Sequence, residues 1–175
     1  MTADGLEANH IPVWFDGESK LWGHIAKANS LWQCLDDGAQ VLVIFQGADS
    51  YISPGWLPSK QEHGKVVPTW DYVAVHVSGC IKFIHDDNRK RELLTKLTDQ
   101  HEQSEAEPWQ IDDAPAAFTD KLLKAIVGFD IVIDKIEAKA KLSQNKSETD
   151  REAIAQRLAS KASPLVAMDP SCDGS

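Results

Sequence analysis

The clearest pattern along the chain is an alternation of apolar and other side chains from Asp71 to Ile84. Valine, glycine, isoleucine and phenylalanine hold the odd positions from 73 to 83. The even positions carry Tyr72, Ala74, His76, Ser78, Cys80 and Lys82. A period of two over this length predicts a long β-strand with one core face, and Gly79 is expected at a bulge or bend. The more polar face is suited to line a groove or a subunit contact.

Shorter patterns predict strands earlier in the chain. The segments Leu6 to Phe15 and Leu21 to Ile25 flank the turn signal Asp16-Gly17, which favours a hairpin. The continuous apolar run Val41 to Phe45 predicts a central strand that is buried on both faces. Tyr51 to Ser53 is expected to form a short edge segment.

Helical spacing of apolar residues appears in four stretches. The predicted helices run from Asn29 to Leu35, from Asp86 or Asp87 to about Gln103, from Asp113 to a stop at Gly128, and onward from Ser147. Their expected apolar stripes are Leu31, Trp32 and Leu35, then Leu93, Leu94 and Leu97, then Phe118, Leu122, Ala125 and Ile126, and finally Ile154 and Leu158. A last strand is expected from Phe129 to Ala138, with Ile131, Ile133 and Ile136 toward the core. This order predicts an α+β protein with an antiparallel sheet or barrel.

The stretch from Ser53 to Tyr72 interrupts these patterns. It contains three prolines, two glycines and the two tryptophans Trp56 and Trp70. Such a segment favours a rigid loop without regular structure. Two interpretations stay open: a binding loop that presents lysines and hydroxyls beside aromatic rings, or a surface loop anchored by two buried tryptophans.

Composition limits the classes of function. The chain has 175 residues, a net charge of −9 and a pI near 5.0. An acidic chain has no overall attraction to nucleic acid or to an anionic membrane surface. Cys34, Cys80 and Cys172 are widely spaced, which favours free thiols and a cytoplasmic location. No apolar run approaches the length of a membrane span.

Individual motifs for chemistry are sparse. The six histidines show no metal-binding spacing, so no metal site is predicted, and no nucleotide-binding or nucleophile motif occurs. Lys27 precedes the predicted N-cap Asn29, where an anion could bind, although a solvated lysine and a simple cap explain the same residues. The segment Lys139 to Asn145 carries two lysines, a hydroxyl and two amides, which suit an oxygen-rich ligand.

Nearly the whole chain up to the last helix nevertheless resembles one family, the FMN-binding negative transcriptional regulators or PaiB-like proteins. The matching segments are Ala8–Pro12, Gly23–Asn29, Phe45–Gly47, Tyr51–Pro54, Trp56, Ser59–Lys60, Gly64–Tyr72, Val75–His76, Trp109, Ile126–Gly128 and Lys141–Asn145. The resemblance implies a split β-barrel of the flavin-reductase and pyridoxamine-phosphate-oxidase type with peripheral helices. It also implies a homodimer that holds FMN in grooves at the subunit interface.

The resemblance places the cofactor contacts. Lys27 with His24 and Asn29 is expected at the FMN phosphate, and Lys65, Thr69 and Trp70 are expected to supply loop contacts. Lys141, Ser143 and Gln144 are expected to approach the flavin or its ribityl chain. These types of residue meet the physical demands, because a phosphate needs cations and N–H donors and a flavin needs an apolar wall with amide partners.

The resemblance also predicts the domain boundaries and shows where this sequence differs from the family pattern. Residues 1–162 are expected to form one FMN-binding domain that lacks the N-terminal helix and first strand of the family, and residues 163–175 a flexible tail. The family's usual Asn in the Thr-Trp-Asn-Tyr motif is Asp71 here, and this carboxylate is expected to point away from a phosphate or to cap a turn. Lys27 stands where arginine is commoner, which keeps the charge but loses the bidentate geometry.

The expected function is a flavin-binding regulatory or redox-sensing protein. One alternative is a flavin-dependent oxidoreductase that acts on a small molecule. A second is a split barrel that binds haem through His76 or His10. Direct DNA binding follows from the family label alone, because the acidic composition does not support it.

Overall fold

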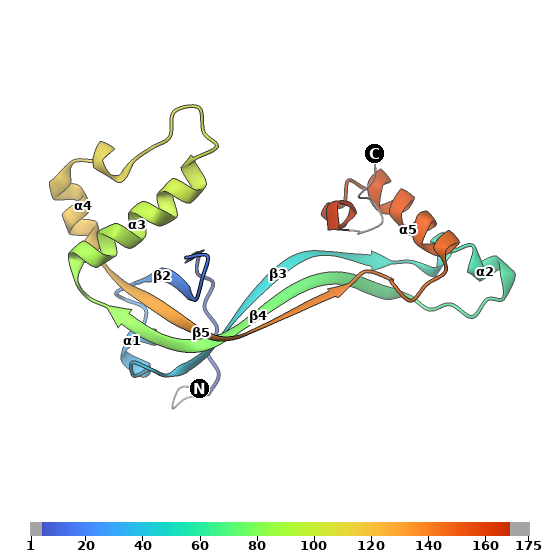
Figure 1. Cartoon of the computed structure of the whole chain (residues 1–175), viewed down its shortest axis with the longest axis horizontal. Helices are drawn as coiled ribbons and strands as arrows, with labels where there is room; N and C mark the ends of the chain where they lie inside the picture. The colour runs from blue at the N-terminus through green and yellow to red at the C-terminus, as the bar shows by residue number, and fades with distance from the viewer. Residues whose placement is uncertain (1–4, 169–175) are drawn as a thin grey trace. The chain divides into compact units, whose positions relative to one another are not determined.

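A computed structural model describes residues 5–168 (Figure 1). Five strands form one sheet in the order β1-β2-β5-β4-β3. The strands are β1 (Val13–Phe15), β2 (Lys20–Ala26), β3 (Gln40–Ile52), β4 (Thr69–Ile84) and β5 (Ile126–Lys141). The helices are α1 (Leu31–Cys34), α2 (Ser59–Glu62), α3 (Asp87–Glu102), α4 (Ala116–Leu123) and α5 (Glu148–Ser160). Three 3₁₀ helices are η1 (Pro54–Trp56), η2 (Ile111–Asp113) and η3 (Pro164–Met168).

The sheet is antiparallel along its length. β1 pairs with β2, and β2 with β5, in antiparallel register. Along β4 and β5 the neighbours run in opposite directions, since Gly79 lies against Val132 while Gly128 lies against Ile84. The predicted hairpin at the start of the sheet is therefore confirmed. Its turn is held by the Asp16 carboxylate, which accepts three backbone N–H groups and so has a pKa below its ordinary value.

The described residues divide into two compact units, and β3, β4 and β5 contribute residues to both. The first comprises residues 5–42 and Ser78–Lys135, and the second comprises Val43–Val77 and residues 136–168. In the first, Trp22, Leu93 and Leu97 form a buried cluster beneath α3, which confirms the predicted stripe of that helix. In the second, the cluster consists of Ile52, Leu57, Ile154, Leu158 and Leu165, which confirms the stripe of α5.

The strand predicted from Val41 to Phe45 exists, but its predicted burial is wrong. β3 lies at one edge of the sheet order and extends to Ile52, so it includes the separate segment that was expected near Tyr51. Leu42 and Ile44 are 56% and 58% exposed. An apolar run reports hydrophobicity without reporting how many neighbours a strand has, and so central and edge strands look alike.

The helix expected to end at Gly128 ends earlier. α4 stops at Leu123, and Gly128 lies inside β5, where a side chain would sit 3.3 Å from Ile84 Cβ. The buried positions of α4 are Thr119 and Leu123, whereas Phe118 is 55% exposed. The predicted stripe is therefore wrong by one position, because the short helix packs against α3 with a different face.

The remaining differences concern shorter segments. The first helix spans four residues, Leu31–Cys34, rather than starting at Asn29. In β5, Ile131 is buried as expected, but Ile136 is 55% exposed. Within the segment expected to be a tail, Pro164–Met168 forms a 3₁₀ helix and Leu165 is 1% exposed. Cys172 lies outside the described residues.

The loop expected from Ser53 to Tyr72 contains regular structure. Ser53 caps η1 by accepting the Gly55 N–H, and α2 follows. Trp56 is half-buried beneath the Lys161 ammonium at 4.5 Å, but Trp70 is 54% exposed and meets Tyr51 edge to face. The interpretation with two buried anchoring tryptophans is therefore wrong for Trp70.

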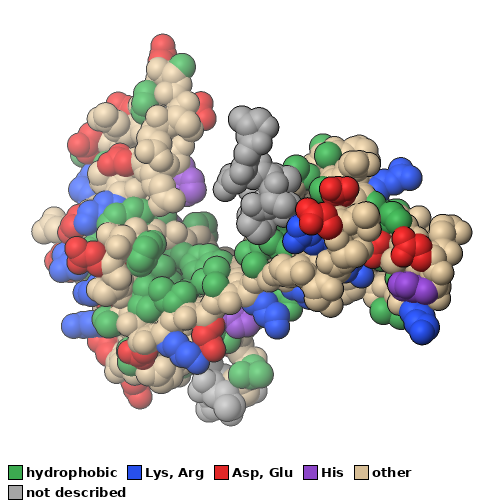
Figure 2. All heavy atoms as spheres, turned by 45° about the vertical axis from the view of Figure 1, so that its right-hand side comes forward, with side chains coloured by type: hydrophobic (Ala, Val, Ile, Leu, Met, Phe, Trp, Pro, Cys, Tyr) green, Lys and Arg blue, Asp and Glu red, His purple; other side chains and the backbone are tan. Residues whose placement is uncertain are grey.

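Charged side chains of both signs lie on the surface. On the face shown in Figure 2, lysine and arginine side chains are interspersed with aspartate and glutamate. Within residues 5–168, no helix has the length and apolar character needed to cross a membrane.

Candidate functional site

The predicted residues fall into two groups, one in each unit. His24, Lys27 and Asn29 belong to the first unit. The second unit contains Lys65, Thr69, Trp70, Lys141, Ser143 and Gln144.

His24 is a neutral, partly buried residue of β2. Its backbone pairs with Gly128 of β5, and its Nδ1 is a buried atom without a hydrogen-bond partner among the described residues. Burial lowers the pKa of His24 below its ordinary value, so the ring is uncharged at neutral pH. A positive charge in this group must therefore come from Lys27.

Lys27 and Asn29 form the turn that follows β2. The Lys27 N–H donates to the Ala125 carbonyl at 2.8 Å, and the Lys27 carbonyl accepts from Trp32 Nε1 at 3.0 Å. The backbone of Lys27 is thus fixed while its side chain is exposed. The amide of Asn29 is already engaged, since it accepts from the Leu31 N–H and donates to Asn9 Oδ1. Lys27 is therefore the residue of this group that best presents a charge to a ligand.

Lys141, at the end of β5, contacts the start of β4. Its ammonium donates to Thr69 Oγ1 and, at 2.7 Å, to the Trp70 carbonyl. These residues are about seventy positions apart in sequence, yet the sheet brings them into direct contact. An ammonium has three donors, so one remains for a ligand. The exposed ring of Trp70 adds an aromatic surface beside this charge.

Asp71 and Ser143 form a buried pair beneath this contact. The Ser143 hydroxyl donates to Asp71 Oδ2 at 2.7 Å, and the two residues are 4% and 2% exposed. Asp71 Oδ1 has no partner among the described residues. Burial raises the pKa of Asp71, an effect opposed by Ser143 and by the charges of Lys141 and Lys146. The expectation that Asp71 caps a turn is wrong, because it lies within β4.

Gln144 and Lys65 are exposed residues near the ends of their segments. Gln144 closes the turn after β5, since its side chain accepts from the Leu142 N–H and donates to the Ala140 carbonyl. Ser143 within this turn has a φ of 59°, an uncommon value for a residue other than glycine. The Lys65 N–H donates to His63 Nδ1 at 3.0 Å.

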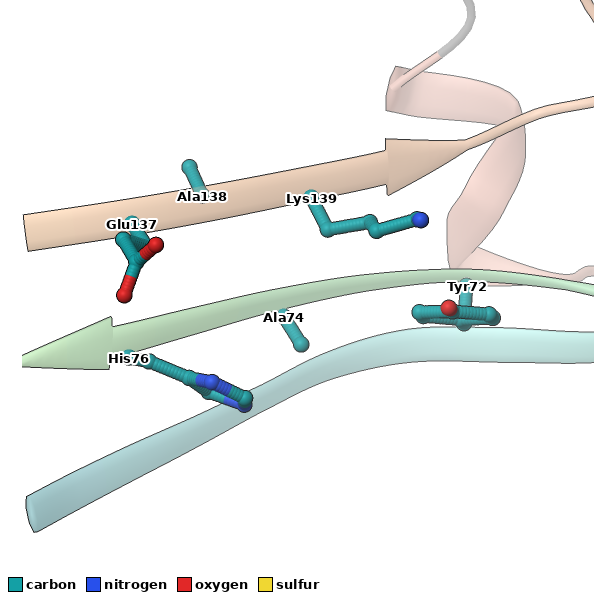
Figure 3. A pocket seen from close by; sticks show the side chains of 6 residues that line it. All are labelled: Tyr72, Ala74, His76, Glu137, Ala138 and Lys139. Atoms are coloured by element: carbon teal, nitrogen blue, oxygen red, sulfur yellow. The ribbon is translucent and has the colours of Figure 1, made fainter.

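A shallow hollow of about 310 Å³ lies on the sheet in the same unit. Figure 3 shows its six lining residues, which are Tyr72, Ala74, His76, Glu137, Ala138 and Lys139. The three residues from β4 belong to the face that the alternation marked as able to line a groove. Glu137, Ala138 and Lys139 were missed as lining residues, although Lys139 was included in the segment suited to an oxygen-rich ligand.

The sheet order and the helices around it define a class of protein. The chain has a TM-score of 0.61 to the flavocytochrome Anf3 from Azotobacter vinelandii, at 16% identity, covering 87% of this chain and 64% of that one. The TM-score is 0.52 to an FAD and heme binding protein from Mycobacterium smegmatis, at 19% identity, covering 83% and 63%. These likenesses confirm the α+β split-barrel fold.

Comparison of sequences then identifies the family. Residues 1–135 match the family described as "Putative FMN-binding domain". The Bacillus subtilis protein named Protease synthase and sporulation protein PAI 2 is 34% identical over 160 residues, covering 90% of this chain and 74% of its own length. The chain belongs to this FMN-binding, PaiB-like family. An uncharacterized Saccharomyces cerevisiae protein is 44% identical over 108 residues, which span 59% of this chain and 64% of the yeast protein.

Proposed function

We propose that the chain binds FMN and that the Lys141 group of the second unit contacts this cofactor. For the first unit, taken by itself, we propose Lys27 as the residue that binds a phosphate. The observation that carries this proposal is the meeting of Lys141 with Thr69 and Trp70 at the ends of two long strands. Membership of an FMN-binding family supports FMN as the ligand of this group. An ammonium with one remaining donor beside an exposed indole suits a polar chain attached to a planar ring.

The residues fit this cofactor chemically. A phosphate is bound by cations and by N–H donors, and the exposed Lys27 side chain supplies the first. Ser143 is too buried to be proposed as a direct contact, so we assign it a positioning role through Asp71. When bound, FMN would supply hydride and electron transfer, and the protein would supply binding and electrostatics.

Titration of the purified chain with FMN, riboflavin and FAD tests the proposal. Quenching of flavin fluorescence should show saturable binding of FMN. Lys141→Gln should weaken the binding of FMN by about tenfold, while Lys60→Gln, which removes a charge from α2 in the same unit, should not change it. Absence of saturable FMN binding by the wild-type chain would refute the proposal.

Lys27 has its own test, which uses the difference between FMN and riboflavin. Lys27→Gln should weaken FMN by about tenfold or more, because it removes a charge-assisted contact to phosphate. It should leave riboflavin unchanged, since riboflavin has no phosphate. Equal losses for both ligands would contradict the assignment of Lys27 to the phosphate.

We further propose a homodimeric, cytoplasmic protein in which the flavin has a regulatory or redox-sensing role. Free Cys34 and Cys80 and the exposed apolar side chains of β3 support this proposal.

Bleaching of the bound flavin by NAD(P)H, with turnover, would instead identify an oxidoreductase. A Soret band would identify a haem protein, for which His76 and His10, both exposed, are the candidate ligands. A gel shift at physiological salt tests direct DNA binding, which the intermixed surface charges do not favour.

A further inference from the structure

The hollow on β4 and β5 is a consequence of side-chain size. Along the exposed face of β4, Ala74 lies between Tyr72 and His76, so a methyl group separates two rings. On β5, Glu137 extends toward β4 in Figure 3, whereas the methyl group of Ala138 points the other way. The result is a low apolar floor with a ring at each end and charged groups along one side.

The polar groups at the edge of the hollow differ in the hydrogen bonds that they can form. Lys139 supplies a cation and Glu137 a hydrogen-bond acceptor, and both come from the same strand. The phenol ring of Tyr72 supplies an aromatic surface. A planar heterocycle with acceptors and a donor on one edge would satisfy these groups together. With a volume of about 310 Å³, the hollow is at the lower end of the range for small-molecule sites, which suits a ring system better than a whole dinucleotide.

The hollow lies next to the Lys141 group along β4 and β5. Tyr72 and Lys139 each lie two positions farther along the strands than Trp70 and Lys141. If the polar chain of a ligand contacts Lys141, the ring of that ligand can therefore bind over the neighbouring residues of the same two strands. All of these residues belong to the second unit.

We infer that this hollow receives the isoalloxazine ring of the flavin, over Ala74 and beside Tyr72, with Lys139 at the N1–C2=O edge and Glu137 at N3–H. The inference rests on the proposed function, because it assumes that a flavin is the ligand. It adds a ring site, formed by residues outside the set assigned to the cofactor, and a specific electrostatic role for Lys139. A cation at N1 stabilises the reduced, anionic flavin more than the neutral oxidised ring.

Filling the hollow tests the location of the ring. Ala74→Leu should weaken riboflavin and FMN by the same factor, about tenfold or more, since both ligands carry the ring. Ala140→Leu is the matched control, because it adds the same side chain to an exposed position of β5 outside the hollow, and it should leave both affinities unchanged. Circular dichroism and thermal unfolding establish that each variant is folded.

Lys139→Gln tests the electrostatic role without adding bulk. The variant should bind reduced FMN about tenfold less tightly relative to oxidised FMN, so the midpoint potential of the bound flavin should become more negative. Lys60→Gln removes a charge elsewhere in the same unit and should leave this ratio unchanged.

The outcomes separate the two proposals. If wild type binds FMN but Ala74→Leu binds both ligands normally, the ring site is refuted while FMN binding stands. An unchanged midpoint potential in Lys139→Gln would likewise refute the role of Lys139. If wild type binds neither flavin, the proposed function fails, and the ring site fails with it.

Discussion

Asp71 places a carboxyl group in the interior of the second unit, where, within residues 5–168, the Ser143 hydroxyl is the side chain that donates to it. The resemblance leads us to expect asparagine at this position, which would keep an acceptor for Ser143 without a charge. Because burial is the dominant influence on the Asp71 carboxyl, its pKa is raised above the ordinary 3.8. The folded protein therefore holds the Asp71 proton more tightly than the unfolded chain does.

The expected effect of Asp71→Asn follows from the upward shift of the Asp71 pKa. A raised pKa means that the wild-type fold loses stability as pH rises from about 3.8 through the folded-state pKa of Asp71. At neutral pH the variant should be more stable than wild type, by about 1–2 kcal/mol. The advantage should shrink as pH falls toward 4, and urea titrations across this range would measure it. A constant difference at every pH would contradict a buried, titrating Asp71.

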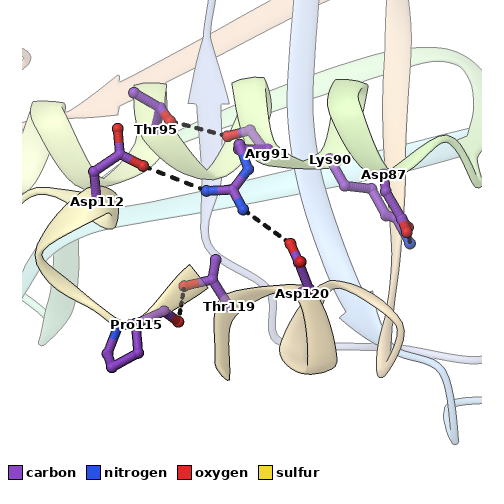
Figure 4. A network of polar contacts seen from close by, with 8 residues as sticks. All are labelled: Asp87, Lys90, Arg91, Thr95, Asp112, Pro115, Thr119 and Asp120. Atoms are coloured by element: carbon purple, nitrogen blue, oxygen red, sulfur yellow. Dashed lines mark hydrogen bonds and ion pairs between the residues drawn. The ribbon is translucent and has the colours of Figure 1, made fainter. Parts of the chain in front are cut away.

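Lys90 is the buried lysine of the first unit. Its ammonium donates to the Leu123 carbonyl at 2.6 Å and pairs with Asp87 at 2.8 Å (Figure 4 shows Lys90 beside Asp87). The hydrogen bond from Lys90 lowers the pKa of Asp87. The lysine thereby satisfies a carbonyl at the C-terminal end of α4 and connects that helix to α3.

Lys90→Met should destabilise the fold by about 2 kcal/mol, because methionine fills the space but leaves the Leu123 carbonyl without its donor. Lys121→Met, on an exposed position of α4, should have an effect near zero. Thermal unfolding of the two variants measures the difference. Equal stabilities would show that the Lys90 contacts contribute nothing net.

Among the structural elements, β4 was the most predictable from sequence. Its alternation marked both faces correctly, and Val77, Ile81 and Phe83 are buried as expected. α3 was equally predictable because Asp86 is an N-cap that accepts the Arg89 N–H, and Leu93 and Leu97 repeat at helical spacing. α4 was not, because it is short and its Asp120 is held to α3 by a polar contact with Arg91, which also pairs with Asp112 of η2 (Figure 4). Such contacts leave no periodic signal.

The candidate site could be predicted only in part, because contacts between distant segments leave no signal in the local sequence. Local sequence marks Lys141 and Thr69 as polar residues at strand ends, but only the pairing of β4 with β5 brings them together. The burial of Asp71 could not be expected from its type, since isolated carboxylates rarely lie in a core. The hollow over Ala74 depends on its neighbours along and across the strands, which a single strand pattern does not report.

Gly79 lies in β4 at a place where β5 leaves no room for a Cβ atom. A Cβ atom there would overlap the Val132 carbonyl oxygen and come within 2.8 Å of Ile131 Cγ2. Gly79→Ala should therefore separate the strands locally and cost about 3 kcal/mol in unfolding free energy. Gly47→Ala is the matched control, because its nearest atom would be the Val73 oxygen at 3.2 Å, and its loss should be smaller. Chemical denaturation compares the two, and a smaller loss for Gly79→Ala would contradict the close approach.

At the scale of the whole molecule, β3 leaves apolar side chains on the surface of a single chain. Ile44 is 58% exposed and Phe45 37%, and β3 has the other strands on one side only in the sheet order. Exposed apolar side chains next to a strand edge are features of association surfaces. They support the proposed homodimer.

Sedimentation equilibrium should therefore give twice the chain mass for wild type at micromolar concentration. Ile44→Glu should shift the equilibrium toward monomer, by about tenfold or more in dissociation constant, because it buries a charge on association. Lys60→Glu, on α2, serves as the charge control and should remain dimeric. A monomeric wild type would refute the proposed dimer.

The sheet order has a further consequence for the synthesis of the chain. β5 lies between β2 and β4, yet among the strands of residues 5–168 it is the last to leave the ribosome. At ordinary rates of translation, β4 waits roughly several seconds for its neighbour. A nascent chain shorter than residue 126 carries an unpaired edge on both β2 and β4, and such edges are templates for aggregation. The synthesis of β5 therefore pairs both of these edges and removes the two templates for aggregation.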